Sequence, residues 1–136
     1  MTGEINIPII VENCFIESFQ ILSCWFDQGF YLKNCNIKNY IDYQMGGHNH
    51  KPILIHGNIF EDFFNFFDCQ FIEFIEVKNN IFLKGSNLLG NINEGFQNTF
   101  EMKPIVENNI GNLCLDGDLP DGTFQGNIVD LGDVKW

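Results

Sequence analysis

The stretch Val11–Ser18, VENCFIES, returns as Leu32–Asn39, LKNCNIKN. Both read apolar, charged, Asn, Cys, any residue, Ile, charged, small polar. The same outline recurs along the chain at spacings of 21, 23 and 22 residues, anchored on Cys14, Cys35, Asn58 and Asn80. Periods of about 20 to 50 residues are typical of solenoids, in which each repeat forms one unit of a stack. The repeat therefore predicts a chain wound into stacked turns.

A second set of anchors lies halfway between the first, at Cys24, Gly46, Cys69 and Asn91. If the turns stack, residues at equal phase form columns, and the columns that face the inside must be apolar. The first half-turn satisfies this in three columns: Ile9, Phe30, Ile53, Ile75; Val11, Leu32, Ile55, Val77; and Ile16, Ile37, Phe60, Phe82. The second half-turn is less regular, with the columns Phe19, Ile41, Phe64, Ser86; Ile21, Tyr43, Phe66, Leu88; and Phe26, His48, Phe71, Asn93.

The composition favours strands over helices. The chain contains no Ala and no Arg but has fifteen Phe and many Ile and Asn. Ala is the best helix former, whereas Ile and Phe suit pleated surfaces and Asn suits turns. The apolar spacing alternates between two and three residues, so a bend is expected after each inward pair. Four such five-residue beats close a square turn, with corners near Asn13, Ser18, Ser23, Asn34 and Asn39.

The positions between the apolar columns carry charges that follow the same repeat. One outward column reads Glu12, Lys33, His56, Lys78, and another reads Glu17, Lys38, Glu61. Opposite charges on neighbouring parallel strands attract weakly, each exposed pair contributing less than about 1 kcal/mol. This pattern therefore specifies the register of the turns more than their stability.

The stretch from Ile9 to about Asn93 resembles the pentapeptide-repeat proteins. The resemblance rests on the motifs CFIES, FQILS, CWFDQ, FYLKN and CNIKN, each with a central Leu, Phe or Ile and a buried residue two positions earlier. It implies a right-handed quadrilateral parallel β-helix. The family prefers a small second inward residue, whereas Cys alternates with Phe here, which implies a flattened or broader cross-section. A right-handed β-helix of the kind found in pectate lyases is the alternative.

The predicted fold is all-β: a short right-handed parallel β-helix of about four to five turns of about 22 residues, covering residues 1–115. The polar, Gly-containing stretch within residues 44–52 predicts a loop that protrudes from one corner. A second interruption at residues 95–103 precedes an incomplete fifth turn around Asn109. The acidic residues 116–136 are expected to form a C-terminal cap or tail, because solenoid ends need protection.

The net charge of −11 with only seven Lys argues against binding to nucleic acid and favours a basic protein as partner. The sequence as given has no secretory signal and no apolar run long enough to span a membrane. A cytoplasmic location without a membrane partner is therefore expected. The five cysteines are expected to be reduced, although Cys14 and Cys35 would lie on adjacent turns within disulfide reach.

Candidate binding residues are few. His48 and His50 form an H-x-H with His56 nearby in sequence, but no third ligand is evident, so a solvated turn is favoured over a metal site. The stretch with Asp116, Asp118 and Asp121 faintly resembles a calcium loop but lacks the distal Glu. We therefore expect no metal and no cofactor. Trp25 and Tyr31 are expected to be exposed aromatic contacts.

The sequence contains no motif for nucleophilic, acid–base or phosphate chemistry, which predicts a protein that is not an enzyme. The leading hypothesis is a protein-binding solenoid, monomeric or dimeric, such as an immunity protein or inhibitor that neutralises a basic toxin or enzyme. One alternative, implied by the family resemblance, is a DNA mimic that acts on a topoisomerase. A third is a self-assembling or carbohydrate-contacting β-helix with Tyr31 and Trp25 along a groove.

Overall fold

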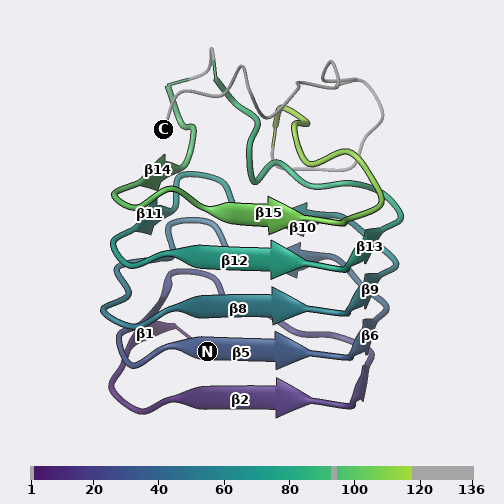
Figure 1. Cartoon of the computed structure of the whole chain (residues 1–136), viewed down its shortest axis with the longest axis horizontal. Coiled ribbons are helices and arrows are strands. Elements are labelled where there is room, and N and C mark those ends of the chain that lie inside the picture. The colour runs from purple at the N-terminus through teal and green to yellow at the C-terminus, as the bar shows by residue number, and fades with distance from the viewer. Residues whose placement is uncertain (1, 93–94, 118–136) are drawn as a thin grey trace.

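The computed structural model describes residues 2–92 and 95–117, and every regular element in these ranges is a β-strand. All strand pairs are parallel, and the chain rises from the N-terminus as a right-handed coil of stacked turns (Figure 1). The predicted all-β solenoid of about four turns is therefore confirmed. Parallel pairing follows from the winding, because each wall is entered in the same direction on every turn.

The longest wall, which we call the front wall, is a five-stranded sheet in the order β15-β12-β8-β5-β2. Its strands are β2 (Ile9–Glu12), β5 (Phe30–Lys33), β8 (Ile53–His56), β12 (Ile75–Lys78) and β15 (Ile105–Glu107). The predicted column of Val11, Leu32, Ile55 and Val77 is confirmed in that order and continues to Val106. Alternate residues face inward, because side chains of a strand point to opposite faces in turn.

Three shorter walls close the coil. The second wall contains β3 (Phe15–Ile16), β6 (Asn36–Ile37), β9 (Ile59–Phe60) and β13 (Ile81–Phe82). The back wall contains β7 (Ile41–Asp42) and β10 (Phe64–Asn65), and a bridge from Phe64 to Ser86 extends it. The fourth wall contains β1 (Gly3–Ile5), β4 (Cys24–Phe26), β11 (Gln70–Phe71) and β14 (Thr99–Phe100). The walls differ in length, so the cross-section is not a regular square.

The corners are made by residues with a positive φ, which recur in columns. The corner after the front wall has Asn13, Asn34, Gly57, Asn79 and Asn108, with φ between 54° and 69°. A second corner has Ser23, Met45 and Asp68, with φ of 53°, 57° and 55°. Gly and Asn tolerate this left-handed conformation best, which explains why Asn recurs at the first corner. The predicted corners near Asn13, Ser23 and Asn34 have a positive φ, whereas Ser18 and Asn39 follow the second-wall strands β3 and β6 without a positive φ.

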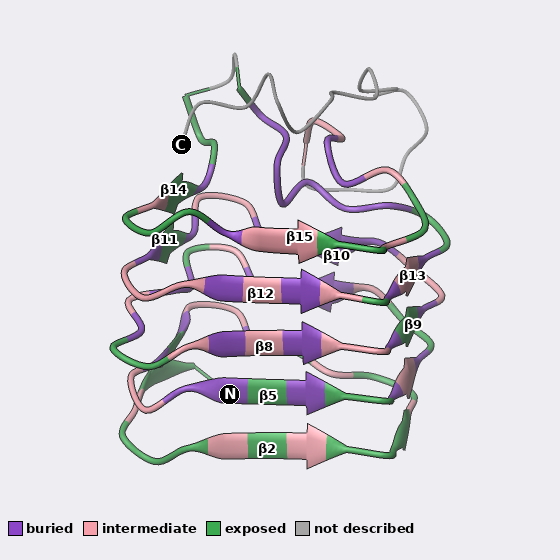
Figure 2. Cartoon of the chain, viewed as in Figure 1, coloured by how far each residue is buried: buried purple, intermediate pink, exposed green. Residues whose placement is uncertain are grey.

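The interior is filled by Phe, Ile, Val and Leu, while the outward residues of the front-wall strands remain partly or fully exposed (Figure 2). Aromatic rings pack along and across the turns, with centroids 4.4 Å apart for Phe26 and Phe30 and 4.8 Å apart for Phe60 and Phe82. Burying a side chain of this size contributes about 1.5–3 kcal/mol. The Phe-rich columns therefore supply the main driving force for folding.

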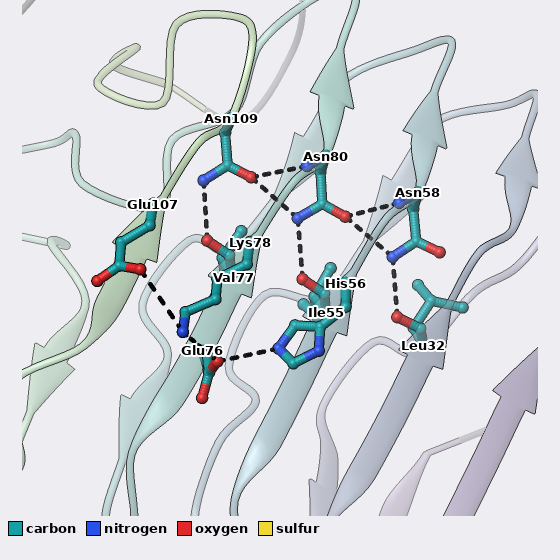
Figure 3. Close-up of polar contacts among 10 residues, drawn as sticks. All are labelled: Leu32, Ile55, His56, Asn58, Glu76, Val77, Lys78, Asn80, Glu107 and Asn109. Atoms are coloured by element: carbon teal, nitrogen blue, oxygen red, sulfur yellow. Dashed lines mark hydrogen bonds and ion pairs between the residues drawn. The ribbon is translucent and has the colours of Figure 1, made fainter.

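A ladder of Asn side chains runs through the stack beside the first corner (Figure 3). Asn80 Oδ1 accepts hydrogen bonds from Asn58 N at 2.9 Å and Asn58 Nδ2 at 3.0 Å, and Asn109 Oδ1 accepts from Asn80 in the same way. Each Nδ2 also donates to a front-wall carbonyl, from Asn58 to Leu32, from Asn80 to Ile55 and from Asn109 to Val77. The ladder satisfies backbone groups that the corner removes from the sheet.

Residues 44–52, where the sequence predicts a protruding loop, take part in the stack. Gly47 forms parallel bridges with Trp25 below and Gln70 above, and Gly46, Gly47 and Asn49 are buried. Tyr43 explains Gly46, where a side chain would overlap the Tyr43 ring, and Tyr43 Oη also accepts a hydrogen bond from Gly47 N at 3.2 Å. The segment is thus a continuation of the fourth wall.

His48 does not fill the inward column in which the sequence places it. Its φ of 49° turns the side chain outward, where the ring packs on Trp25 with centroids 4.2 Å apart. The buried Tyr43 ring occupies the interior instead, 5.9 Å from Phe26 and 6.4 Å from Phe71. A ring from a neighbouring corner therefore replaces the missing apolar residue, which sequence phase alone does not reveal.

The last described turn is longer than the others. Gln70 pairs with Thr99, so the partner in the next turn is 29 residues on, instead of about 22. As a result Asn98, and not Asn91, takes the anchor position above Cys69, and Phe100 lies above Phe71. Asn93, which the sequence assigns to that column, lies outside the described residues. The predicted fifth turn around Asn109 is confirmed. Residues 118–136, predicted to form most of the cap, lie outside the described residues.

None of the five cysteines forms a disulfide, and they differ sharply in exposure. Cys14 is exposed, whereas Cys24, Cys35, Cys69 and Cys114 are buried. Burial raises the pKa of the Cys24, Cys35 and Cys69 thiols, which disfavours the reactive thiolate. In the native protein we expect a thiol reagent to modify only Cys14 quickly, with the others reacting after unfolding. Mass spectrometry of the alkylated protein checks this, and a Cys14→Ser variant that still reacts natively would contradict it.

Candidate protein-binding face

The outward side of the front wall, which we call the front face, carries one central column and one charged column. The central column begins with Ile10 and Tyr31, which are 60% and 40% exposed, and continues with Leu54, Glu76 and Ile105. The charged column is Glu12, Lys33, His56, Lys78 and Glu107. The lower half of the front face is therefore apolar beside a charged border, as in many protein interfaces.

A hollow of about 310 Å³ opens beside this apolar part. Gly29 lies between Pro8 and Pro52 at equal phase on successive turns, and a side chain there would crowd the Pro52 carbonyl oxygen and Lys51, at 3.0 Å and 3.3 Å. Gly29 also has a φ of 92°, a conformation that favours glycine. Each proline precedes the first residue of a strand, where no ladder donor is needed. The hollow is lined by Pro8, Ile9, Ile10, Gln28, Gly29, Tyr31, Lys51 and Pro52.

The upper half of the front face is held by charges (Figure 3). Lys78 Nζ lies 2.8 Å from Glu76 Oε1 and 3.5 Å from Glu107 Oε2. The hydrogen bond with Glu76 is the main reason why the pKa of Lys78 is raised. His56 Nε2 lies 3.4 Å from the same Glu76 oxygen. Lys78 thus pairs with both carboxylates, which leaves the apolar half as the part of the front face open to a partner.

The histidine pair predicted from the H-x-H motif is separated. His48 packs on Trp25, whose Nε1 donates to the carbonyl oxygen of Met45 at 3.1 Å. His50 Nδ1 instead contacts Asp27 on the turn below, and this hydrogen bond is the main reason why the pKa of Asp27 is lowered. Among residues 2–92 and 95–117, no group of three His, Cys, Asp or Glu side chains could hold a metal ion.

The remaining predicted site residues lie apart from the front face. Asp116 Oδ1 accepts a hydrogen bond from Asn91 N at 2.7 Å, so this carboxylate closes the last described turn. Asp118 and Asp121 lie outside the described residues. Trp25 belongs to the fourth wall, whereas Tyr31 belongs to the front wall. The two exposed aromatics therefore do not line one groove.

The hollow is the feature that sequence reasoning missed. A signal existed, because Pro8, Gly29 and Pro52 hold equal phase in three successive turns, but only a shared wall makes them neighbours.

No protein-family model matches the chain, and neither a curated protein nor a solved structure is significantly similar to it. In the described residues, no helix is long and apolar enough to cross a membrane.

Proposed function

We propose that this solenoid is a non-catalytic protein-binding protein that uses the apolar half of its front face. The observation that carries the proposal is the pair Ile10 and Tyr31, exposed beside a hollow of about 310 Å³ on a five-stranded sheet. Aromatic and large apolar side chains beside a pocket are typical interface hot spots, and a rigid sheet loses little entropy on binding.

The partner that fits this protein best is basic. The described residues contain thirteen Asp and Glu but only six Lys. Such a field attracts a basic surface and speeds its association at low salt. A toxin or enzyme neutralised by an immunity protein or inhibitor is the partner class that we favour, acting in the cytoplasm. The four-walled coil supports the resemblance to pentapeptide-repeat proteins, while the unequal walls favour the alternative, a right-handed β-helix of the kind found in pectate lyases.

The other two hypotheses find less support. A DNA mimic needs regularly spaced carboxylates, but Lys33 and Lys78 interrupt the charged column of the front face. A carbohydrate groove was expected to combine Tyr31 with Trp25, and these residues lie on different walls. A protein partner therefore remains the best proposal.

Replacement of Tyr31 by alanine tests the proposal. We expect at least about tenfold weaker capture of a partner from extracts of the source cells, because a central aromatic hot spot contributes about 2 kcal/mol or more. Quantitative pull-down with the parent protein and the variant measures the loss. Trp25→Ala is the matched control, since Trp25 is also 40% exposed but belongs to the fourth wall. Equal capture by the parent and Tyr31→Ala proteins would rule the front face out.

A further inference from the structure

The N-terminal end of the coil presents an open sheet edge. Strand β2 is the last strand of the front wall, β3 is the last of the second wall, and β1 lies at the edge of the fourth wall, so among the described residues no strand pairs with them from below. The lowest turn of Figure 2 shows the result: β2 has no buried residue, whereas β5, β8 and β12 have two each.

The hydrogen bonds between β2 and β5 show which backbone groups of this edge are free. Ile9 N donates to Gly29 O and Asn13 N donates to Lys33 O, so these amides point up toward β5. In a parallel sheet alternate residues bond to opposite neighbours, so the amides of Ile10 and Glu12 point down to the open edge. On the next wall, Asn36 N donates down to Cys14 O, which places the amide of Phe15 at the same edge.

The inward side chains of this lowest turn are also only half covered. Ile9, Val11 and Ile16 are partly exposed, whereas Phe30, Leu32 and Ile37 one turn higher are at most 1% exposed. One further strand below β2 would cover Ile9 and Val11 as β2 covers β5. Both backbone donors and apolar surface are therefore ready for an added strand, the arrangement used in β-augmentation.

The charges specify which strand fits. Acidic and basic side chains face each other between neighbouring turns: Glu17 of the lowest turn lies 4.0 Å from Lys38, Asp62 lies 3.6 Å from Lys84, and Lys78 lies 3.5 Å from Glu107. The open edge carries Glu4, Glu12 and Glu17, all exposed, and the first Lys of the chain is Lys33. A second copy of this edge would bring like charges together.

We propose that the N-terminal edge binds an extended basic segment of a partner protein by strand addition beneath β2. This inference rests on the proposed function and specifies which element of the partner binds. Alternate apolar side chains of the partner's segment cover Ile9 and Val11, and its Lys or Arg side chains meet Glu12. Ile10 belongs both to this edge and to the lining of the hollow. The added strand therefore continues the front face, and the partner contacts the strand edge and Tyr31 together.

Two synthetic peptides test the inference on the full chain, one alternating Lys with Val and the other alternating Glu with Val. We expect the Lys peptide to slow hydrogen exchange of the Ile10 and Glu12 amides by at least about tenfold at saturation, measured by NMR. The Glu peptide should have no effect. Glu12→Gln should weaken binding of the Lys peptide. Glu12→Pro removes the backbone amide of residue 12, which does not hydrogen-bond to β5, and should abolish the binding.

Several outcomes would overturn the inference while leaving the proposed function intact. Equal protection by both peptides would show that charge does not select the strand, and unchanged exchange would show that the edge is not used. Protection that grows with protein concentration in the absence of peptide would assign the edge to a second copy. A further outcome is that Tyr31→Ala loses partner capture while Glu12→Pro captures the partner as well as the parent protein does. That result would support the front face as the binding surface and would exclude strand addition.

Discussion

Replacing Asn80 by alanine is expected to lower the free energy of unfolding by about 3–5 kcal/mol, because it orphans several buried groups at once. Asn80 is 1% exposed, and its amide bonds to Asn58, Asn109 and the carbonyl oxygen of Ile55. Alanine leaves the buried Asn58 amide and the carbonyl oxygen of Ile55 without these hydrogen bonds. Denaturant unfolding with an unchanged m-value measures the loss, which would be a large part of the stability of a typical domain.

Asn79 provides the matched control for this substitution. It is the neighbouring residue of the same type, but it is exposed and forms the corner with a φ of 59°. Glycine adopts this conformation without strain, so Asn79→Gly should change stability by no more than about 1 kcal/mol. Similar effects of the two substitutions would mean that the ladder does not hold the turns together.

Gly47→Ala is the second substitution with a large expected effect, about 3 kcal/mol or more. Its φ of 91° strains any other residue, and an added Cβ would overlap the backbone of Gln70 on the turn above. The overlap forces the two turns apart and breaks the bridge between Gly47 and Gln70. Thermal or denaturant unfolding of the variant measures the cost.

Gly3→Ala separates the backbone strain at Gly47 from the overlap of the added Cβ with Gln70. Gly3 has a φ of 92°, but a Cβ at that position meets nothing within 4 Å. The same backbone strain without the overlap should therefore cost only about 1–2 kcal/mol. If Gly47→Ala cost no more than Gly3→Ala, residues 44–52 would form a loop outside the stack, as their Gly and polar residues suggested.

Most of the fold could be predicted from the sequence because stacking repeats one environment. Val11, Leu32, Ile55 and Val77 occupy the same position in successive turns, so each must be apolar, and their spacing along the sequence reveals the period. The prediction fails where a turn changes length or direction. The spacing of 29 residues from Gln70 to Thr99 shifts the phase, so that Phe100 pairs with Phe71. At His48 a positive φ reverses the side chain.

The candidate site was less predictable. The exposure of Tyr31 and Trp25 was expected from alternation along a strand, but placing them in one groove required knowledge of which wall each strand joins. His48 and His50 are adjacent in the motif yet contact different partners, Trp25 and Asp27, because the chain turns between them.

The sequence by itself determined the coil, its period and the inward columns, because each depends on the burial of apolar side chains at a constant phase. The tertiary structure decided what lies between the columns: the Asn ladder, the hollow beside Gly29 and the unpaired edge of β2. These features arise where residues far apart in the chain meet on neighbouring turns. A hydrogen bond or an open space there depends on corner angles and turn lengths, which residue type does not specify.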